Sequence, residues 1–124
     1  MRKALPLLHQ QRYEAFRQRL SHVDQTIASD KNTVALRLSV TELEQFFRHQ
    51  LLSLQLDALS PATQHWLQSY QVEFDKQLRL LNLDAMLLQA ARQPATIEQR
   101  QRQVSDRLST LQQYCDAVLE KGEE

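Results

Sequence analysis

Residues 60–94 read SPATQHWLQSYQVEFDKQLRLLNLDAMLLQAARQP, and this stretch carries clear signals for the start and the end of a helix. Ser60 is a preferred N-cap residue, and Pro61 suits the first helical position. Pro94 marks the end of the pattern because proline interrupts a helix. The apolar positions in between recur every three or four residues: Leu67, Tyr70, Phe74, Leu78, Leu81, Ala85 and Leu88. We therefore predict a helix over 61–92, about 48 Å long.

Three further helices are predicted over 5–28, 33–56 and 96–120 because each carries an apolar stripe at helical spacing. The apolar residues of the first stripe are Leu5, Leu8, Phe16, Leu20, Val23 and Ile27. The spacing of three or four residues is continuous if Arg12 occupies the one gap, and Tyr13 lies nearby. The second stripe is Leu36, Val40, Leu43, Phe47, Leu51 and Leu54. The stripe over 96–120 is Ile97, Val104, Leu108, Leu111, Cys115 and Val118, and Gln101 occupies the one gap in its helical spacing.

The helix boundaries leave two alternatives open in the second segment. Residues 29–32 form a polar break before it. Apolar residues alternate over 34–40, which allows a short strand, and residues 41–44 (TELE) match a capping box that would start the helix at Thr41. A second capping box, residues 96–99 (TIEQ), opens the last helix, and residues 120–124 are expected to be a fraying tail.

The short breaks favour antiparallel neighbours. We therefore predict a single all-α domain over 1–124, an antiparallel up-down-up-down four-helix bundle with a long third helix. A three-helix arrangement that dimerises is the alternative. The composition agrees, because Leu and Gln, both good helix formers, make up 40 of the 124 residues. The chain has one Gly, Gly122, which excludes Gly-rich phosphate loops and disfavours a β-rich fold.

Charge and cysteine content narrow the classes of protein. Fifteen basic residues balance fifteen acidic ones, so the basic excess of a typical duplex-DNA binder is missing. A single Cys allows no internal disulfide, which suits a reducing cytoplasm. No apolar run is long enough for a transmembrane helix, and the N-terminal residues lack the apolar core of a signal peptide. We expect a cytoplasmic protein that does not associate with membranes.

The residues offer little support for catalysis. The Glu-x-x-His motif of di-iron helical bundles does not occur, and His9, His22, His49 and His65 are predicted to be exposed on the surface. Cys115 lies in an apolar stripe beside Asp116, whose charge would raise the pKa of the thiol, so we expect a small core residue. We expect no enzymatic activity, no metal and no cofactor.

Several residues could instead bind a partner. Leu80, Leu83 and Leu87, widened by Met86, form a second stripe on the long helix. This stripe either packs against both neighbouring helices or is exposed and mediates self-association. The same question applies to the leucines over 51–59 (Leu51, Leu52, Leu54, Leu56 and Leu59). Trp66 and Tyr70 are core candidates, although one of them could anchor an interface.

Four arginines lie at or within the last helix: Arg92, Arg100, Arg102 and Arg107. They could contact nucleic acid or an acidic partner. The alternative is a solvated face balanced by Glu98 and Asp106, which is favoured because no aromatic residues are interleaved for base stacking.

Several segments together resemble the cyanobacterial PatD family, the heterocyst frequency control proteins. They are residues 69–73 (SYQVE), 76–81 (KQLRLL), 84, 91–93 (ARQ), 105–108 (SDRL), 114–115 (YC) and 45–47 (QFF), and the resemblance covers about residues 66–119. It implies a small all-helical cytoplasmic protein without enzymatic activity. It also implies binding to the tubulin-like division protein FtsZ, modulation of FtsZ assembly and a limit on heterocyst number.

The polar residues that match the family pattern are Lys76, Arg79, Asp84, Arg92, Asp106 and Arg107. Two roles compete for them. They could form ion pairs between helices, for example Arg92 or Arg79 with Asp106, or they could present a charged patch to a partner. FtsZ-type proteins are generally acidic, so a basic patch would favour encounter. A helical homodimeric scaffold and a weak nucleic-acid-binding module are the alternatives, and the chain is expected to be a monomer or a homodimer.

Overall fold

The chain folds into helices, in a computed structural model that describes residues 5–29 and 32–122. Along this part of the chain the α-helices are α1 (Leu7–Ser29), α2 (Thr33–Phe46), α3 (Pro61–Ala90) and α4 (Pro94–Gly122). A short π-helical segment, η1 (Phe47–Leu51), directly continues α2. Residues 34–40 are α-helical, so the alternative of a short strand there is wrong.

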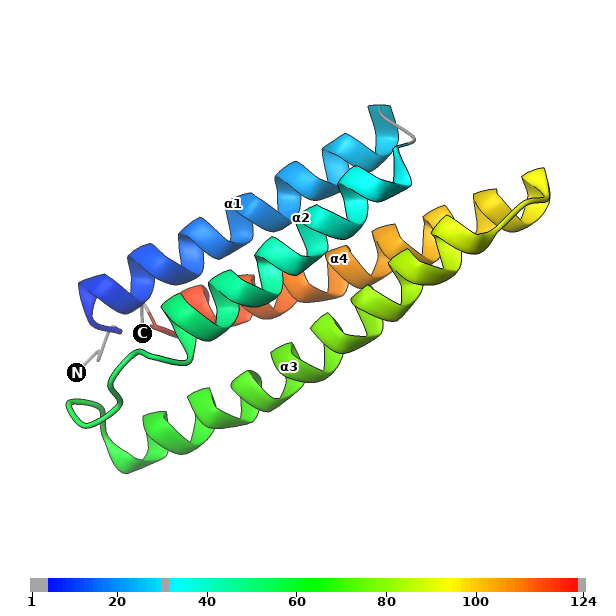
Figure 1. Cartoon of the computed structure of the whole chain (residues 1–124). Coiled ribbons are helices and arrows are strands. Elements are labelled where there is room, and N and C mark those ends of the chain that lie inside the picture. Colours follow the sequence, from blue (N-terminus) through cyan, green and yellow to red (C-terminus); the bar gives the residue numbers. More distant parts are fainter. Residues whose placement is uncertain (1–4, 30–31, 123–124) are drawn as a thin grey trace.

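The helices form a ring in which each one runs antiparallel to the next (Figure 1). α1 packs against α2 and α4, and α3 packs against the same two helices. This arrangement confirms the all-α, up-down-up-down four-helix bundle with a long third helix. The α3–α4 hairpin extends beyond the neighbouring ends of α1 and α2, as the yellow and orange ribbons show (Figure 1).

One apolar core fills the interior of the ring, and the predicted stripes of α2, α3 and α4 supply most of it. Every stripe residue of these helices is buried or, for Tyr70 and Ile97, partly buried against the core. Phe74 lies at its centre, where five aromatic rings surround it at centroid distances of 5.7–6.4 Å: Tyr13, Phe16, Phe47, Tyr70 and Tyr114.

The buried face of α1 differs from the predicted stripe in its first two turns. Leu8 is half exposed, whereas His9 and Tyr13 are buried. The buried positions 9, 13, 16, 20 and 23 alternate steps of four and three, the regular spacing of a packed helix. The prediction that His9 is a surface residue is therefore wrong, while His22, His49 and His65 are exposed as predicted.

The start of α2 is set by Asn32 and not by the capping box at Thr41. The Asn32 side-chain oxygen accepts hydrogen bonds from the backbone N–H groups of Val34 and Ala35, both at 3.1 Å. These bonds satisfy two of the four donors that a helix N-terminus leaves open. Thr41 lies inside α2 and donates its hydroxyl to the carbonyl of Arg37. Of the predicted break, Ser29 belongs to α1, and residues 30–31 lie outside the described residues.

We predict that Asn32→Ala lowers the free energy of unfolding by about 1 kcal/mol, because two backbone N–H groups lose their acceptor. Urea unfolding followed by circular dichroism would measure this loss. Thr41→Ala is the matched control at the rejected start site, with an expected change of at most about 0.5 kcal/mol. Equal losses in the two variants would contradict the assignment of Asn32 as the cap.

The second helical segment ends at Leu51, five residues before the predicted end at residue 56. In η1 the backbone N–H of Leu52 donates to the carbonyl of Phe47 at 2.9 Å, a π-helical bond. Arg12 of α1 donates to the carbonyl of Gln50 at 3.0 Å. A cation at this position satisfies a carbonyl that the end of the helix leaves open. The chain then turns, and Leu54 reaches the core from outside the helix.

The ends of α3 and α4 also shift by about one turn or less. Ser60 caps α3 as predicted, with its hydroxyl accepting from the N–H of Thr63 at 3.2 Å. α3 ends at Ala90, two residues earlier than expected, because Ala91 is extended. α4 starts at Pro94 and not at Thr96, since proline fits the first turn of a helix. α4 continues to Gly122, so residues 120–122 of the expected tail are helical, and residues 123–124 lie outside the described range.

Candidate partner-binding surface

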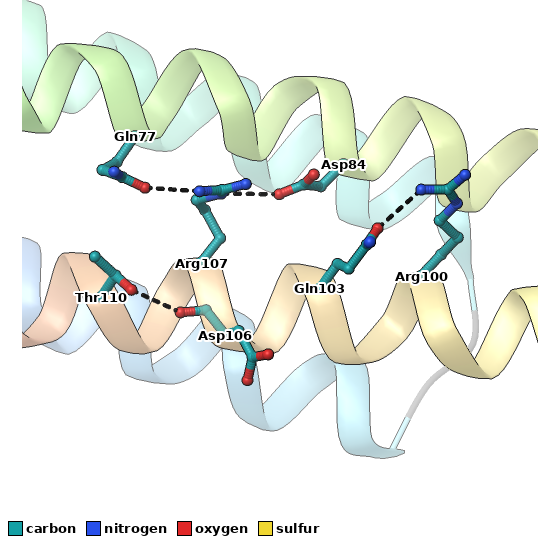
Figure 2. A network of polar contacts seen from close by, with 7 residues as sticks. All are labelled: Gln77, Asp84, Arg100, Gln103, Asp106, Arg107 and Thr110. Atoms are coloured by element: carbon teal, nitrogen blue, oxygen red, sulfur yellow. Dashed lines mark hydrogen bonds and ion pairs between the residues drawn. The ribbon is translucent and has the colours of Figure 1, made fainter.

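A polar network joins α3 to α4 at the side of the core (Figure 2). The guanidinium of Arg107 donates to the carboxylate of Asp84 at 3.0 Å and to the side-chain oxygen of Gln77 at 3.0 Å. Asp84 and Gln77 are buried, and Arg107 is partly buried. Because buried polar groups are costly unless they are satisfied, this network ties the two helices together at one relative position. Asp84 and Arg107 therefore have a structural role.

The other predicted ion pairs between helices do not form. The Asp106 carboxyl points away from α3 (Figure 2). Arg79 pairs instead with Asp75 on its own helix at 3.1 Å, as the spacing of four residues predicts. Arg92 is exposed and donates to the carbonyl of Gln89 at 3.4 Å. The suggested pairing of Arg92 or Arg79 with Asp106 is therefore wrong, because the α3–α4 register brings Arg107 and Asp84 together.

The arginines of α4 do not share one face. Arg100 and Arg107 lie on the side toward α3, where Arg100 donates to Gln103 at 3.0 Å (Figure 2). Arg102 is exposed on a different side, within 4.0 Å of Glu98. A continuous basic stripe along α4, as nucleic-acid binding would require, is therefore not formed by these side chains.

The second leucine stripe of α3 is exposed even though α3 packs against both neighbours. Leu83 is 48% exposed and Met86 is 44% exposed, and Leu87 is also exposed. Leu80, one turn earlier, is partly buried. Val72 lies further along the same face and is exposed as well. We call these five residues the α3 strip.

Two basic residues lie on the same face of α3 as the five apolar residues of the α3 strip. Lys76 follows Val72 by four residues and precedes Leu80 by four, so it lies on the same face of the helix. Arg79 precedes Leu83 by four residues, and its side chain is highly exposed. Lys76 and Arg79 are therefore the two predicted site residues that the structure brings together with the predicted self-association residues.

The remaining apolar candidates lie mostly against the core. Trp66 contacts Tyr70 edge-to-face at 5.3 Å, and both pack partly buried against the core. Of the leucines over 51–59, Leu52 is largely exposed. The other four are buried or partly buried: Leu51, Leu54, Leu56 and Leu59. The α3 strip therefore has more exposed apolar side chains than the segment over 51–59.

Three titratable groups of α1 and α4 are buried. His9 is 5% exposed, and within the described residues neither its ring nitrogens nor the Tyr13 hydroxyl has a hydrogen-bond partner. Burial raises the pKa of Tyr13 well above its usual range. Burial, and then the Asp116 charge, raise the pKa of Cys115, which confirms it as a core residue. Sequence reasoning missed His9, although its four-residue spacing from Tyr13 was a usable signal.

Burial lowers the pKa of His9 below 6.5, and the positive charge of Arg12 acts in the same direction. The nearby backbone of Gln55 acts in the opposite direction and raises the pKa of His9, although it forms no hydrogen bond with the ring nitrogens. The folded state therefore binds this proton less readily than the unfolded state. We predict that the free energy of unfolding decreases as the pH falls through and below 6.5.

Urea unfolding between neutral and mildly acidic pH would test this prediction. His9→Gln should remove the His9 part of the pH dependence, whereas His65→Gln, at an exposed position, should leave the profile unchanged. Superimposable profiles for the wild type and His9→Gln would contradict a role for His9.

In the part of the chain that the structure describes, three hollows lie along the seams of α1 with its neighbours. A hollow lined mainly by α1 and α2, including Val23, Ile27 and Leu36, has room for about one water molecule, with a volume of about 20 Å³. Larger hollows of about 400 Å³ and 460 Å³ lie open along the α1–α2 and α1–α4 seams. Residues 5–29 and 32–122 contain no group of three or more His, Cys, Asp or Glu side chains arranged to hold a metal ion. Over the same residues, every helix is too short or too polar to cross a membrane.

Comparisons of the chain with protein-family models, with curated proteins and with solved structures find no match.

Proposed function

We propose that this protein is a non-enzymatic helical regulator that binds the tubulin-like division protein FtsZ and modulates its assembly. Through cell division it would then influence heterocyst frequency in an organism that forms heterocysts. The α3 strip is the observation that carries this proposal, because exposed apolar side chains beside cations are typical of protein-binding surfaces. The resemblance to the PatD family supplies the identity of the partner.

Four of the six predicted polar site residues divide between two tasks in this proposal. Asp84 and Arg107 fix the position of α4 against α3. Lys76 and Arg79, on the exposed face of α3, contact the partner. A bundle that binds polymeric FtsZ more tightly than its monomer shifts the equilibrium toward assembly by mass action, and the reverse preference opposes assembly.

Co-sedimentation with FtsZ, with and without GTP, tests the proposal, together with light scattering by the polymers. We expect the protein to pellet with FtsZ polymers and to change their scattering. Lys76→Ala combined with Arg79→Ala should weaken pelleting by about tenfold at low salt. Arg19→Ala is the matched control, because Arg19 is an exposed cation of α1 that lies over the Phe46 ring. A folded protein that neither pellets with FtsZ nor alters its scattering would refute the proposal.

A second candidate is a homodimeric scaffold, favoured by the exposed leucines of the α3 strip. In this case a second copy of the chain would cover Leu83 and Leu87. Sedimentation analysis would then show a dimer that Leu83→Glu converts to a folded monomer. A monomeric wild type at all accessible concentrations would exclude this candidate.

A further inference from the structure

The shape of the α3 strip fits a single partner helix. The strip extends from Val72 to Leu87, which is about 22 Å along the helix axis. It is one helix face wide, because α2 and α4 pack on either side of α3. Leu80, Leu83 and Leu87 follow one another at steps of three and four residues, the same spacing that one face of a partner helix presents, and Lys76 occupies the helical position between Val72 and Leu80.

The charge along the strip is positive. The Asp75 and Asp84 carboxylates of α3 already pair with Arg79 and Arg107. On the edge toward α2, Glu44 lies within 3.9 Å of Arg48. These pairs occupy the carboxylates next to the leucines, whereas Glu73 lies beside Val72 and three residues from Lys76, where it offsets part of the positive charge at that end of the strip.

Two further cations, Lys76 on the face of the strip and Arg100 on α4, take part in none of the ion pairs given above. Lys76 is exposed near the N-terminal end of the strip, between Val72 and Leu80. Arg100 extends from α4 toward α3 and is bonded to the neutral amide of Gln103 (Figure 2). An occupant that carries carboxylates on both sides of an apolar face would complement this arrangement.

We infer that the α3 strip binds an acidic amphipathic helix of a partner protein. The leucines and Met86 receive its apolar face, and Lys76 and Arg100 meet the carboxylates that flank this face. The inference rests on the proposed function in taking the partner to be a protein, and it adds which surface is used and what the partner segment must carry.

A second copy of the chain fits this surface less well. It would bring Lys76 and Arg100 to the interface with Glu73 as the one nearby α3 carboxylate outside the pairs described, because Asp75 and Asp84 already pair with Arg79 and Arg107. Five apolar side chains, one of them partly buried, also form a small patch compared with the roughly 800 Å² per partner of a stable interface. The area suits a reversible contact with one helix.

A pair of designed peptides of about 18 residues tests the inference. Both carry Leu on one helical face; the first flanks this face with Glu and the second with Lys. Fluorescence anisotropy of the labelled peptides, titrated with the full chain, measures binding. We expect the Glu peptide to bind at least about tenfold more tightly than the Lys peptide at low salt, with a smaller difference at high salt.

Variants of the chain locate the binding surface. Leu83→Glu should weaken binding of the Glu peptide by about tenfold or more, and Lys76→Ala should weaken it by several-fold. Leu38→Glu is the matched control, because Leu38 is 61% exposed on α2. Circular dichroism would confirm that each variant is folded. Absence of Glu-peptide binding, equal binding of the two peptides, or equal losses in Leu83→Glu and Leu38→Glu would overturn the inference.

The same proteins separate this inference from the proposed function. If the Glu peptide binds at Leu83 but FtsZ does not pellet the protein, the surface is supported and the named partner is refuted. If FtsZ pellets the wild type and Leu83→Glu equally, the partner is supported and the surface is refuted. A dimer that Leu83→Glu dissociates would show that a second copy covers the strip, and this would also overturn the inference.

Discussion

Replacing Phe74 with alanine is expected to lower the free energy of unfolding by about 4 kcal/mol. Phe74 is fully buried in α3, and aromatic rings from the other helices and from its own helix surround it. The substitution leaves a cavity at the point where all four helical segments meet, and it removes five ring contacts. Urea unfolding followed by circular dichroism would measure the loss.

Phe46→Ala is the control for the loss of a ring at the edge of the core. Phe46 is only partly buried, although it stacks on Phe16 at 5.9 Å. We expect the loss in free energy of unfolding for Phe46→Ala to be at most about half of the loss for Phe74→Ala. Water can fill the space left at this partly exposed position, or the neighbouring side chains can relax into it. Similar losses in the two variants would contradict the central position of Phe74.

Replacing Arg107 with alanine is expected to lower the free energy of unfolding by about 2–3 kcal/mol, because the buried Asp84 carboxyl loses its ion-pair partner. The Asp84 side chain is 9% exposed and that of Arg107 is 29% exposed, so the effect is somewhat smaller than for a fully buried pair. Gln77 loses its hydrogen-bond donor in the same variant. Chemical unfolding measures the loss.

Two comparisons would show that this loss comes from the pair. Arg79→Ala breaks the exposed pair with Asp75 and should cost at most about 0.5 kcal/mol. Combining Asp84→Asn with Arg107→Ala should cost less than the sum of the single losses, because the uncharged amide needs no cation. Additive losses would show that Asp84 and Arg107 act independently.

The sequence was sufficient for the bundle and for most of its core, because the steps of three and four residues in α2, α3 and α4 depend only on local spacing. It failed in α1, where the buried ring of His9 was assigned to the surface because of its polarity. The helix ends were harder to predict. The choice between Asn32 and Thr41 depends on which side chain turns back onto the backbone, and both residue types are suitable caps.

The candidate site was predictable only where the interactions are local. Asp75 and Arg79 are one turn apart, so their pairing follows from the helix itself. The pairing of Arg107 with Asp84 depends on how α4 slides along α3, which no short stretch of sequence determines. Gln77 was missed for the same reason, although it lies one heptad before Asp84 on the same face. The exposure of Leu83 could not be predicted for the same reason, because it depends on where α2 and α4 pack around α3.

The contact between α1 and α4 has a consequence for the order of events on the ribosome. Arg17 pairs with Asp116, 99 residues further along the chain, and Asp24 accepts from Ser105, 81 residues further along. At roughly 5–20 residues per second, synthesis of α4 takes a few seconds after α3 is complete. During that time α1 and α3 present to solvent, or to a chaperone, the apolar sides that only α4 covers. The nascent chain is therefore most exposed to aggregation just before α4 emerges.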